Sequence, residues 1–251
     1  MSKVIFITGA TSGFGAATAR LFARNGWKVV ATGRRESRLE ALRAEFAPGQ
    51  VHIATMDLTD ADSISAAVDG LPDDFTPVMC LFNNGGLALG SQPVPDIKIE
   101  DWRLMVETNI MGLLNTTMAV LPLLRAAGRG ASIINTGSVA ARFAYKGGNV
   151  YGASKAFVRQ FSYNLRTDLA DTDIRVTDLE PGMAKTEFTA VRNYGDFEAN
   201  EKFYEGTEPI EAEDIAETVW WLANRPPHIN VNAIEIMAQC QTPGGFAIRR
   251  R

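Results

Sequence analysis

A tyrosine and a lysine stand four positions apart in the run Tyr151-Gly152-Ala153-Ser154-Lys155. Residues at this spacing lie on the same face of a helix, one turn apart. A lysine ammonium near a phenol favours the phenolate, so we expect it to lower the pKa of Tyr151 from its usual value of about 10. The pair therefore predicts a side chain that exchanges a proton with an alcohol near neutral pH.

Two more polar residues fit the same chemistry. Ser138 follows a predicted strand, where its hydroxyl can hydrogen-bond a substrate oxygen. Asn109, in the preceding predicted helix, can hold a water that links Lys155 to solvent. The Tyr-x-x-x-Lys spacing is common on ordinary helices, so each of these signals is weak by itself. They gain weight from a glycine-rich loop near the start of the chain.

That loop, Thr8–Gly15, follows the first predicted strand, has the spacing T-G-x-x-x-G-x-G and runs into a helix. Glycines permit a tight turn and bring the backbone close to a phosphate, while the helix amino terminus offers free N–H groups to the anion. The first strand-to-helix turn is where a dinucleotide-binding loop belongs, which favours this function over a ligand-free connection. The loop residues that we expect to contact a cofactor are Gly9, Thr11, Ser12, Gly13, Phe14 and Gly15.

The end of the second predicted strand indicates which nicotinamide cofactor fits. An acidic residue there would hydrogen-bond the ribose 2′-hydroxyl of NAD. Gly33 stands at that position instead, and Arg34 and Arg35 follow it. A guanidinium presents a planar fork of donors that suits a phosphate, so we expect both arginines, helped by Ser12, to bind the 2′-phosphate of NADP. The alternative is a solvated arginine pair beside the acidic residues of the next helix.

Short β-branched runs alternate with longer helical stretches along the chain. This alternation predicts an α/β, doubly wound Rossmann fold with a seven-stranded parallel sheet and helices on both faces. The predicted strands are Val4–Thr8, Lys28–Thr32, Val51–Met56, Val78–Asn83, Ala131–Thr136, Ile174–Glu180 and Ile234–Met237. The predicted helices are Gly13–Asn25, Ser37–Phe46, Asp60–Asp69, Ile99–Ala127 with a bend near Pro122, Val150–Leu169 and Ala212–Ala223. No linker or internal repeat divides the chain, so we expect one domain over residues 1–251, with a polar and irregular segment at 183–211.

Composition narrows the classes of partner. The 25 Lys and Arg against 29 Asp and Glu give a net charge of −4, which argues against a dedicated nucleic-acid binder. The two cysteines and two histidines match no metal spacing, and few cysteines suit a reducing compartment, so we expect a cytoplasmic protein without a metal. The apolar start, Val4–Ile7, is too short for a signal peptide, and no run reaches the roughly 20 apolar residues of a membrane span.

These motifs together resemble the short-chain dehydrogenase/reductase family, over essentially the whole chain. The resemblance implies a catalytic tetrad of Asn109, Ser138, Tyr151 and Lys155, and a substrate lid at about 183–211. Besides Tyr151 and Lys155, it assigns to the cofactor the residues Asp57, Leu58, Asn84, Gly85, Gly86, Pro181, Gly182 and Thr186. Glycine replaces the alanine of the family's N-N-A-G segment at Gly85, and we expect a slightly looser turn there.

Several runs narrow the resemblance, among them Gly148–Phe161 and Thr186-Glu187-Phe188. They are similar to a bacterial subgroup of NADP-dependent 3-hydroxy acid dehydrogenases, which implies serine, allo-threonine, or 3-hydroxypropionate and malonic semialdehyde as substrates. The sulfoacetaldehyde reductases share these runs and a tail similar to Phe246-Ala247-Ile248, so a sulfonate substrate is the alternative to a carboxylate. Members of the family are usually tetramers, which implies a homotetramer.

A small anionic substrate needs a cation, and two arginines could supply it. Arg192 lies in the implied lid, and Arg142 lies four residues after Ser138. Either guanidinium suits bidentate contact with a carboxylate, and for each the alternative is a solvated surface arginine. The chain is thus expected to be an NADP-dependent oxidoreductase. The alternative of another class is a non-catalytic NADP-binding regulatory protein, although such proteins typically lack tetrad residues that this chain retains.

Overall fold

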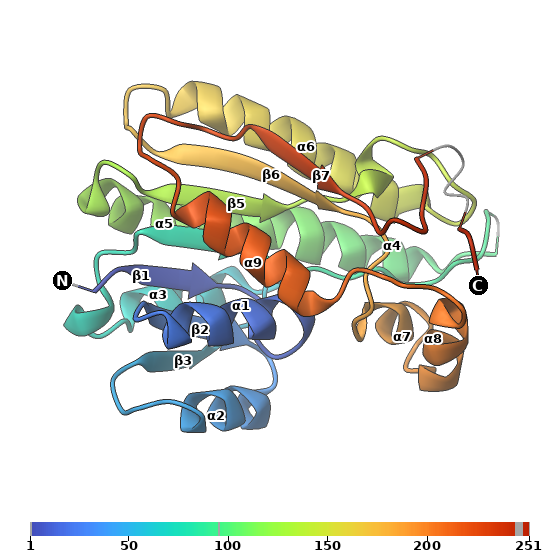
Figure 1. Cartoon of the computed structure of the whole chain (residues 1–251), viewed down its shortest axis with the longest axis horizontal. Coiled ribbons are helices and arrows are strands. Elements are labelled where there is room, and N and C mark those ends of the chain that lie inside the picture. Colours follow the sequence, from blue (N-terminus) through green and yellow to red (C-terminus); the bar gives the residue numbers. More distant parts are fainter. Residues whose placement is uncertain (1, 95, 244–247, 251) are drawn as a thin grey trace.

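Seven parallel strands form one sheet in the order β3-β2-β1-β4-β5-β6-β7 in the computed structural model, which describes residues 2–94, 96–243 and 248–250 (Figure 1). For residues 199 and 200 it describes the backbone only. The strands are β1 (Val4–Ile7), β2 (Lys28–Gly33), β3 (Val51–Thr55), β4 (Cys80–Asn83), β5 (Ser132–Thr136), β6 (Arg175–Pro181) and β7 (Ala233–Ile236). Each lies within two residues of its predicted bounds.

Helices cover both faces of this sheet. They are α1 (Gly13–Arg24), α2 (Glu36–Ala44), α3 (Ala61–Asp69), α4 (Ile99–Val106), α5 (Gly112–Ala127), α6 (Asn149–Asp168), α7 (Phe188–Arg192), α8 (Phe197–Tyr204) and α9 (Ala212–Ala223), with 3-10 turns at Asp73–Phe75 and Val139–Ala141. Side chains alternate along a strand, so Ile5 and Ile7 of β1 pack with residues of α1, α2 and α9. Val4 and Phe6 pack on the opposite face with residues of α3 and α5.

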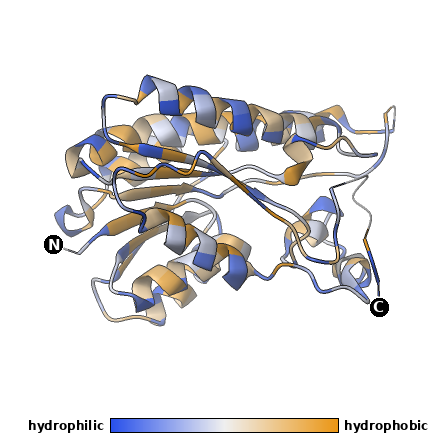
Figure 2. Cartoon of the chain, turned by 45° about the horizontal axis from the view of Figure 1, so that its top comes forward, coloured by the Kyte–Doolittle hydropathy of each residue, from blue (hydrophilic) through white to orange (hydrophobic). Residues whose placement is uncertain are grey.

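The predicted doubly wound α/β fold is confirmed by this arrangement. Figure 2 shows hydrophobic residues concentrated in the strands between the two helical layers. The strand order reverses between β1 and β4, because the chain moves from β1 to β2 and β3 on one side and from β4 to β7 on the other. The loops after β1 and β4 diverge at this point, and ligands of such sheets bind in the crevice between them.

The segment 183–211 is not irregular throughout, which corrects the sequence-based expectation. It contains α7 and α8, which lie beyond the carboxyl ends of the strands (Figure 1). Ala190 and Tyr204 are buried, so apolar packing stabilises both short helices. Sequence reasoning missed them because short helices in a polar segment show little apolar periodicity. The organisation as one domain stays a prediction, and Phe246 and Ala247 of the tail lie outside the described residues.

The long predicted helix Ile99–Ala127 departs from α-helical geometry, but not at Pro122. It consists of α4, a π-helical turn over Glu107–Met111 and α5, and Pro122 lies inside α5. The π turn contains Asn109, one of the residues predicted for the tetrad. Single π turns within helices occur frequently at functional sites, where they change which residues face a neighbour.

The same run is long and apolar enough to cross a membrane by length and composition, because an 18-residue window within it has a mean hydropathy of 1.4. This finding corrects the expectation that no run of the chain would meet such a criterion. It is a weak indication of a span, because core helices meet the criterion as well. In this structure Met105, Val120 and Leu124 are buried, and α5 packs against α3 and β4. Part of the apolar surface of the run is therefore used inside the fold.

Candidate active site

A cavity of about 760 Å³ opens at the carboxyl ends of the strands, a volume within the usual range for ligand pockets. Most residues predicted for the site line it: Gly9, Thr11, Ser12, Gly13, Phe14, Arg34, Arg35, Asp57, Leu58, Asn84, Gly85, Gly86, Ser138, Tyr151, Lys155, Pro181, Gly182, Thr186 and Arg192. Three predicted residues, Gly15, Asn109 and Arg142, are not part of its wall. The fold thus brings residues from the connections that follow six different strands to one place.

The glycine loop after β1 needs its glycines for two different reasons. Gly9 has a φ angle of +69°, in the left-handed region that favours glycine. A Cβ on Gly15 would overlap the carbonyl oxygen of Gly9. Gly15 therefore permits close packing of α1 against the loop, and it is not among the residues that line the cavity.

The turn after β4 is tied to the glycine loop by hydrogen bonds. The Nδ2 of Asn84 donates to the carbonyl oxygen of Thr8 at 2.9 Å, and the N–H of Gly85 donates to the Thr8 hydroxyl at 2.8 Å. A Cβ on Gly85 would lie 2.5 Å from Cδ1 of Leu58, the end of a flexible side chain, so an alanine here would require Leu58 to shift.

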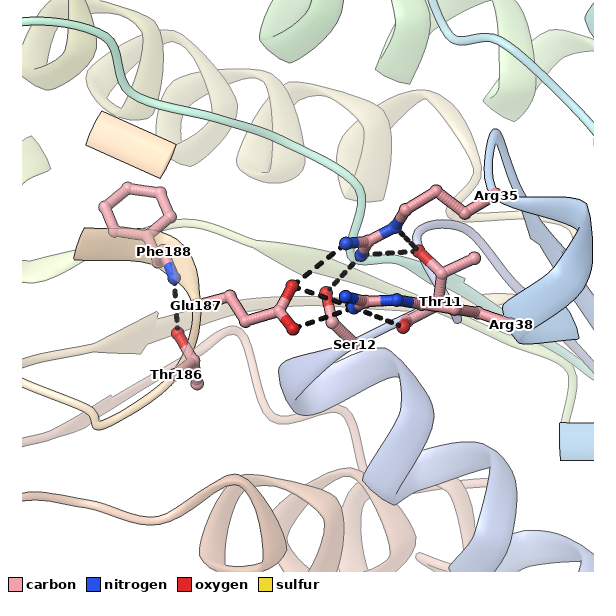
Figure 3. Close-up of polar contacts among 7 residues, drawn as sticks. All are labelled: Thr11, Ser12, Arg35, Arg38, Thr186, Glu187 and Phe188. Carbon is pink, nitrogen blue, oxygen red and sulfur yellow. Dashed lines mark hydrogen bonds and ion pairs between the residues drawn. The ribbon is translucent and has the colours of Figure 1, made fainter. Parts of the chain in front are cut away.

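The two arginines after β2 lie at the edge of the cavity in different environments. The Nη2 of Arg35 donates to the hydroxyls of Thr11 and Ser12, at 2.8 Å each, and its Nη1 pairs with Glu187 at 2.9 Å (Figure 3). Arg34 is exposed and makes no hydrogen bond or ion pair with the residues that the structure describes. Arg34 can therefore meet an anion directly, whereas Arg35 can do so only in competition with Glu187.

Tyr151 and Lys155 lie in the first turns of α6. The Nζ of Lys155 lies 5.9 Å from the centroid of the Tyr151 ring and donates to the carbonyl oxygen of Thr136 at 2.7 Å. Burial raises the pKa of Tyr151 to about 12, although a hydrogen bond with Ser138 and the charge of Arg192 act in the opposite direction. The expectation of a lowered pKa is therefore wrong, because the removal of the phenol from water outweighs the charges around it. Tyr151 is a neutral phenol at neutral pH, which suits a proton donor.

Lys155 has a buried acidic neighbour, Asp178, which is itself hydrogen-bonded with Glu180. Burial lowers the pKa of Lys155 to about 8, and the Asp178 carboxylate opposes this shift. The pKa of Asp178 rises to about 8, first because of burial and then because of a hydrogen bond with Glu180 and repulsion from it. Asp178 and Glu180 are fully buried, and they lie on the same face of β6 because they are two residues apart. Sequence reasoning did not single out either acid.

Asn109 lies behind the cavity wall. Its Oδ1 accepts from the N–H of Leu87 at 2.9 Å, and its Nδ2 donates to the carbonyl oxygen of Leu87 at 2.8 Å. The same amide donates to the hydroxyl of Ser154 at 3.1 Å. Both N–H donors of the amide are thus used within the protein, and the observed geometry favours a role in positioning the loop after β4.

Arg192, the last residue of α7, lines the cavity beside Tyr151. Its guanidinium donates to the carbonyl oxygens of Gly90 and Gly147 at 3.2 and 2.9 Å, and to the hydroxyl of Tyr145 at 3.1 Å. The guanidinium carbon lies 6.0 Å from the centroid of the Tyr151 ring. All of these partners are neutral, and no described carboxylate forms an ion pair with Arg192. An anion in the cavity would meet an uncompensated charge.

Arg142 is engaged elsewhere. Its Nε pairs with Glu180 at 2.6 Å and with Glu235 at 3.4 Å, and it borders a separate, smaller pocket. These contacts do not favour the prediction that Arg142 binds the substrate anion, because its charge compensates the fully buried carboxylate of Glu180. The partner lies 38 residues further along the chain, which a local pattern cannot reveal.

Besides the two buried acids of β6, sequence reasoning missed three residues near the site. Arg38 follows Arg35 by three positions in α2, and that helical spacing was the signal that could have found it. Tyr145 lines the cavity and Glu187 binds the arginines, but no spacing in the sequence marks either. Among the described residues, no group of three or more His, Cys, Asp or Glu side chains is placed to hold a metal ion.

Comparisons with known proteins agree with this geometry. A family model described as short chain dehydrogenase matches residues 3–195. The chain is 52% identical over 252 residues to the serine 3-dehydrogenase of Agrobacterium fabrum, covering 100% of this chain and 99% of the relative. It is 51% identical over 251 residues to sulfoacetaldehyde reductase 2 of Chromohalobacter salexigens, covering 100% of both. A solved structure described as the closed form of serine dehydrogenase complexed with NADP+ has a TM-score of 0.93 at 45% identity, covering 99% of this chain and 100% of that one.

Proposed function

The chain belongs to the short-chain dehydrogenase family, and from this premise we propose that it is an NADP-dependent oxidoreductase of small anionic 3-hydroxy acids. The reaction interconverts the 3-hydroxyl of the acid and the carbonyl of the corresponding semialdehyde. The proposed substrates are serine, allo-threonine and 3-hydroxypropionate, the last formed from malonic semialdehyde. The observation that carries this proposal is the uncompensated Arg192 guanidinium beside Tyr151, in the cavity that the glycine loop also lines.

The residues around the ends of β1 and β2 fit NADP. The glycine loop allows backbone N–H groups and the start of α1 to approach a pyrophosphate. Arg34 offers a guanidinium at the cavity edge that pairs with no described residue, and Ser12 and Arg35 lie beside the loop. We assign the adenine end to Asp57 and Leu58. The residues assigned to the nicotinamide end are Pro181, Gly182 and Thr186. When bound, the nicotinamide supplies hydride for reduction and accepts it in oxidation.

The proton chemistry is assigned to α6 and the loop after β5. In reduction, the carbonyl carbon gains hydride and the carbonyl oxygen needs a proton, which the neutral phenol of Tyr151 donates. The hydroxyl of Ser138, hydrogen-bonded with Tyr151, holds the same oxygen. The buried ammonium of Lys155 stabilises the phenolate that Tyr151 becomes, and a proton then returns to Tyr151. In oxidation the phenolate takes the hydroxyl proton, so the two directions use the same atoms.

Arg192 orients the anionic end of the substrate. A three-carbon acid has little apolar surface to bury, so the contact with its charged group must fix its position. A sulfonate presents oxygens to the same guanidinium, and sulfoacetaldehyde is therefore a second candidate substrate. The 51% identity to a sulfoacetaldehyde reductase favours keeping this candidate beside the carboxylates.

A homotetramer in the cytoplasm is the proposed state of the enzyme. Support comes from the resemblance to a family of tetramers, from the scarcity of cysteine and from apolar side chains that the single chain leaves exposed. Met118 of α5 is 67% exposed and Tyr163 of α6 is 38% exposed, so association would bury apolar surface there. Light scattering of the purified protein tests the assembly, and a monomer at micromolar concentration would contradict it.

Steady-state kinetics test the proposed reaction. Purified protein with NADPH is offered malonic semialdehyde, sulfoacetaldehyde and a neutral aldehyde of similar size, and with NADP+ it is offered L-serine and 3-hydroxypropionate. We expect kcat/KM for the better anionic aldehyde to exceed that for the neutral one by tenfold or more, the scale of one charge-assisted contact. A neutral aldehyde as the best substrate would contradict the proposed substrate class. Preference for sulfoacetaldehyde over malonic semialdehyde would select the sulfonate candidate.

A further inference from the structure

A carboxylate from the lid segment occupies the arginine cluster at the end of β2. Glu187 pairs with Nη1 of Arg35 at 2.9 Å and with Nη1 of Arg38 at 2.7 Å (Figure 3). The second carboxylate oxygen of Glu187 also accepts from Arg38, at 2.9 Å. Burial alone would raise the pKa of Glu187, but hydrogen bonds from the two arginines lower it below its usual value. Glu187 is therefore an anion at neutral pH, held between two cations.

The same donors belong to the region proposed for the 2′-phosphate of NADP. Arg35 also contacts Ser12, and Arg38 approaches the backbone oxygen of Thr11 at 3.4 Å. Carboxylates and phosphates bind the guanidinium fork in the same way, through paired charge-assisted hydrogen bonds. A phosphate monoester carries more charge than a carboxylate, about −1.5 to −2 at neutral pH. The Glu187 carboxylate and the 2′-phosphate thus compete for the same guanidinium donors, and the phosphate, with its larger charge, is attracted more strongly to them.

Glu187 is connected to the opposite end of the cavity by a short stretch of chain. It directly precedes α7, and the last residue of that helix is Arg192, beside Tyr151. The side chains of Glu187, Arg35 and Arg38 are 32%, 42% and 44% exposed. The ion pairs therefore lie at the surface end of the cavity, where a ligand can reach them, and exchange of one anion for another needs no unfolding of the core.

We propose that Glu187 is a cofactor-selectivity residue that acts by competition: its carboxylate occupies Arg35 and Arg38, and the 2′-phosphate of NADP(H) displaces it. This inference rests on the proposed NADP dependence. NAD(H), which lacks the phosphate, leaves both ion pairs intact. Binding of NADP(H) therefore includes the cost of releasing Glu187, and binding of NAD(H) does not. The same contacts would also fit a role in which Glu187 holds the two guanidinium groups in place for the phosphate. That role predicts that removal of the Glu187 charge weakens the binding of NADPH.

The decisive variant is Glu187→Gln, which keeps the size of the side chain and removes its charge. We expect the Kd for NADPH to tighten roughly three- to tenfold, the scale of one or two half-exposed ion pairs, and the Kd for NADH to stay within about twofold. Glu36→Gln is the matched control, because Glu36 is an exposed acid next to Arg35 and has no hydrogen bond or ion pair with described residues. It removes the same charge near the same arginine and should leave both Kd values within about twofold.

Binding is measured at constant ionic strength by nucleotide fluorescence, and by calorimetry with adenosine 2′-monophosphate and adenosine 5′-monophosphate. The change in Kd for adenosine 2′-monophosphate should match the change for NADPH. The change in Kd for adenosine 5′-monophosphate should match the change for NADH. Weaker NADPH binding by Glu187→Gln, an equal change for both nucleotides, or no change would each overturn the competition. If Glu187→Gln does not fold, Glu187→Asp replaces it. The shorter side chain reaches the arginines less well, so it should tighten the binding of NADPH by a smaller factor.

Measurements on the wild-type protein distinguish this inference from the proposed NADP dependence on which it rests. Wild-type protein that binds neither nucleotide, or that prefers NADH, would contradict the proposed NADP dependence before any variant is made. Wild-type protein that prefers NADPH, together with an unaltered Glu187→Gln variant, would contradict only the role of Glu187.

Discussion

The guanidinium of Arg192 lies over the ring of Tyr151, with 6.0 Å between the guanidinium carbon and the ring centroid. One end of a helix in the segment 183–211 is thereby placed against the residue proposed to donate the proton. An anion bound to Arg192 would therefore lie near the phenol ring, and we expect a short anionic substrate to reach from the guanidinium to the Tyr151 hydroxyl.

Arg192→Ala should lower kcat/KM for an anionic semialdehyde by roughly tenfold to a hundredfold, the scale of one charge-assisted contact. KM should rise because binding weakens, and kcat should fall because the carbonyl is no longer held in position. A neutral aldehyde should lose about threefold or less. Arg192→Lys is the matched control and should recover part of the loss. Equal losses for both aldehydes would instead identify Arg192 as a residue that stabilises α7.

Tyr151→Phe should reduce kcat by at least about a hundredfold, the usual contribution of one general acid–base group. The variant keeps the ring, which packs against Phe188, so the Kd for NADPH should stay within about twofold. Stopped-flow reduction and nucleotide fluorescence measure the two quantities separately. Turnover close to that of the wild type would remove Tyr151 from the proton step.

The double variant Arg34→Ala with Arg35→Ala should bind NADPH more weakly by roughly tenfold to a hundredfold. Its affinity for NADH should fall much less, because only NADP(H) carries the 2′-phosphate. The single variants should differ from each other. Arg34 has no described partner to give up, so its loss should cost more than the loss of Arg35, which already pairs with Glu187. Titration of both nucleotides by fluorescence gives the comparison, and equal losses for NADPH and NADH would make the pair structural.

Arg142→Ala should destabilise the fold and leave substrate selection unchanged. Removal of this partner leaves the fully buried carboxylate of Glu180 with Arg159, at 3.2 Å, as its one cationic partner among the described residues, so the free energy of unfolding should fall by about 1–3 kcal/mol. KM for the anionic semialdehyde should stay within about twofold. Urea denaturation and steady-state kinetics provide the two readings. A raised KM at unchanged stability would restore Arg142 as a substrate contact.

Asp178→Asn should change how stability depends on pH. The pKa of Asp178 in the fold, about 8, lies above its ordinary value, so its contribution to stability is complete below about pH 4 and is lost as pH rises through 8. The difference in unfolding free energy between wild type and Asp178→Asn should therefore fall between pH 4 and 8, by roughly 2–5 kcal/mol. Denaturation of the cofactor-free proteins across this range tests the slope, and a constant difference would contradict a raised pKa. The lowered pKa of Lys155 acts above pH 8, outside this window.

The fold could be predicted because its signals are local. The run Val4–Ile7 is apolar on both faces, as a central parallel strand must be, and the glycine loop after it has one compatible geometry. Tyr151 and Lys155 could be paired because a helix fixes the relation between residues four apart. Most of the residues predicted for the site lie near the ends of regular elements, and the structure brings these to one cavity.

What the sequence could not provide depends on contacts between distant segments. Arg142 and Arg192 have the same chemistry, and only the fold shows that one meets a buried glutamate while the other meets neutral groups in the cavity. The rise in the pKa of Tyr151 comes from burial, which spacing does not measure. The position of Glu187 depends on how the segment 183–211 folds back onto α2, and no motif encodes it.

The π turn at Glu107–Met111 sets the rotational phase of α5 relative to α4. Buried positions recur at every fourth residue, from Asp101 through Met105, Asn109 and Leu113 to Thr117. An uninterrupted α-helix advances about 100° per residue, so such a row would drift by about 40° per step and wind out of the core. The wider turn winds more slowly and resets the row. Deletion of one residue here would restore regular winding and keep α4 and α5 nearly in phase, whereas regular winding over all the residues would rotate α5 by about 100° relative to α4 and carry Val120 and Leu124 out of the core.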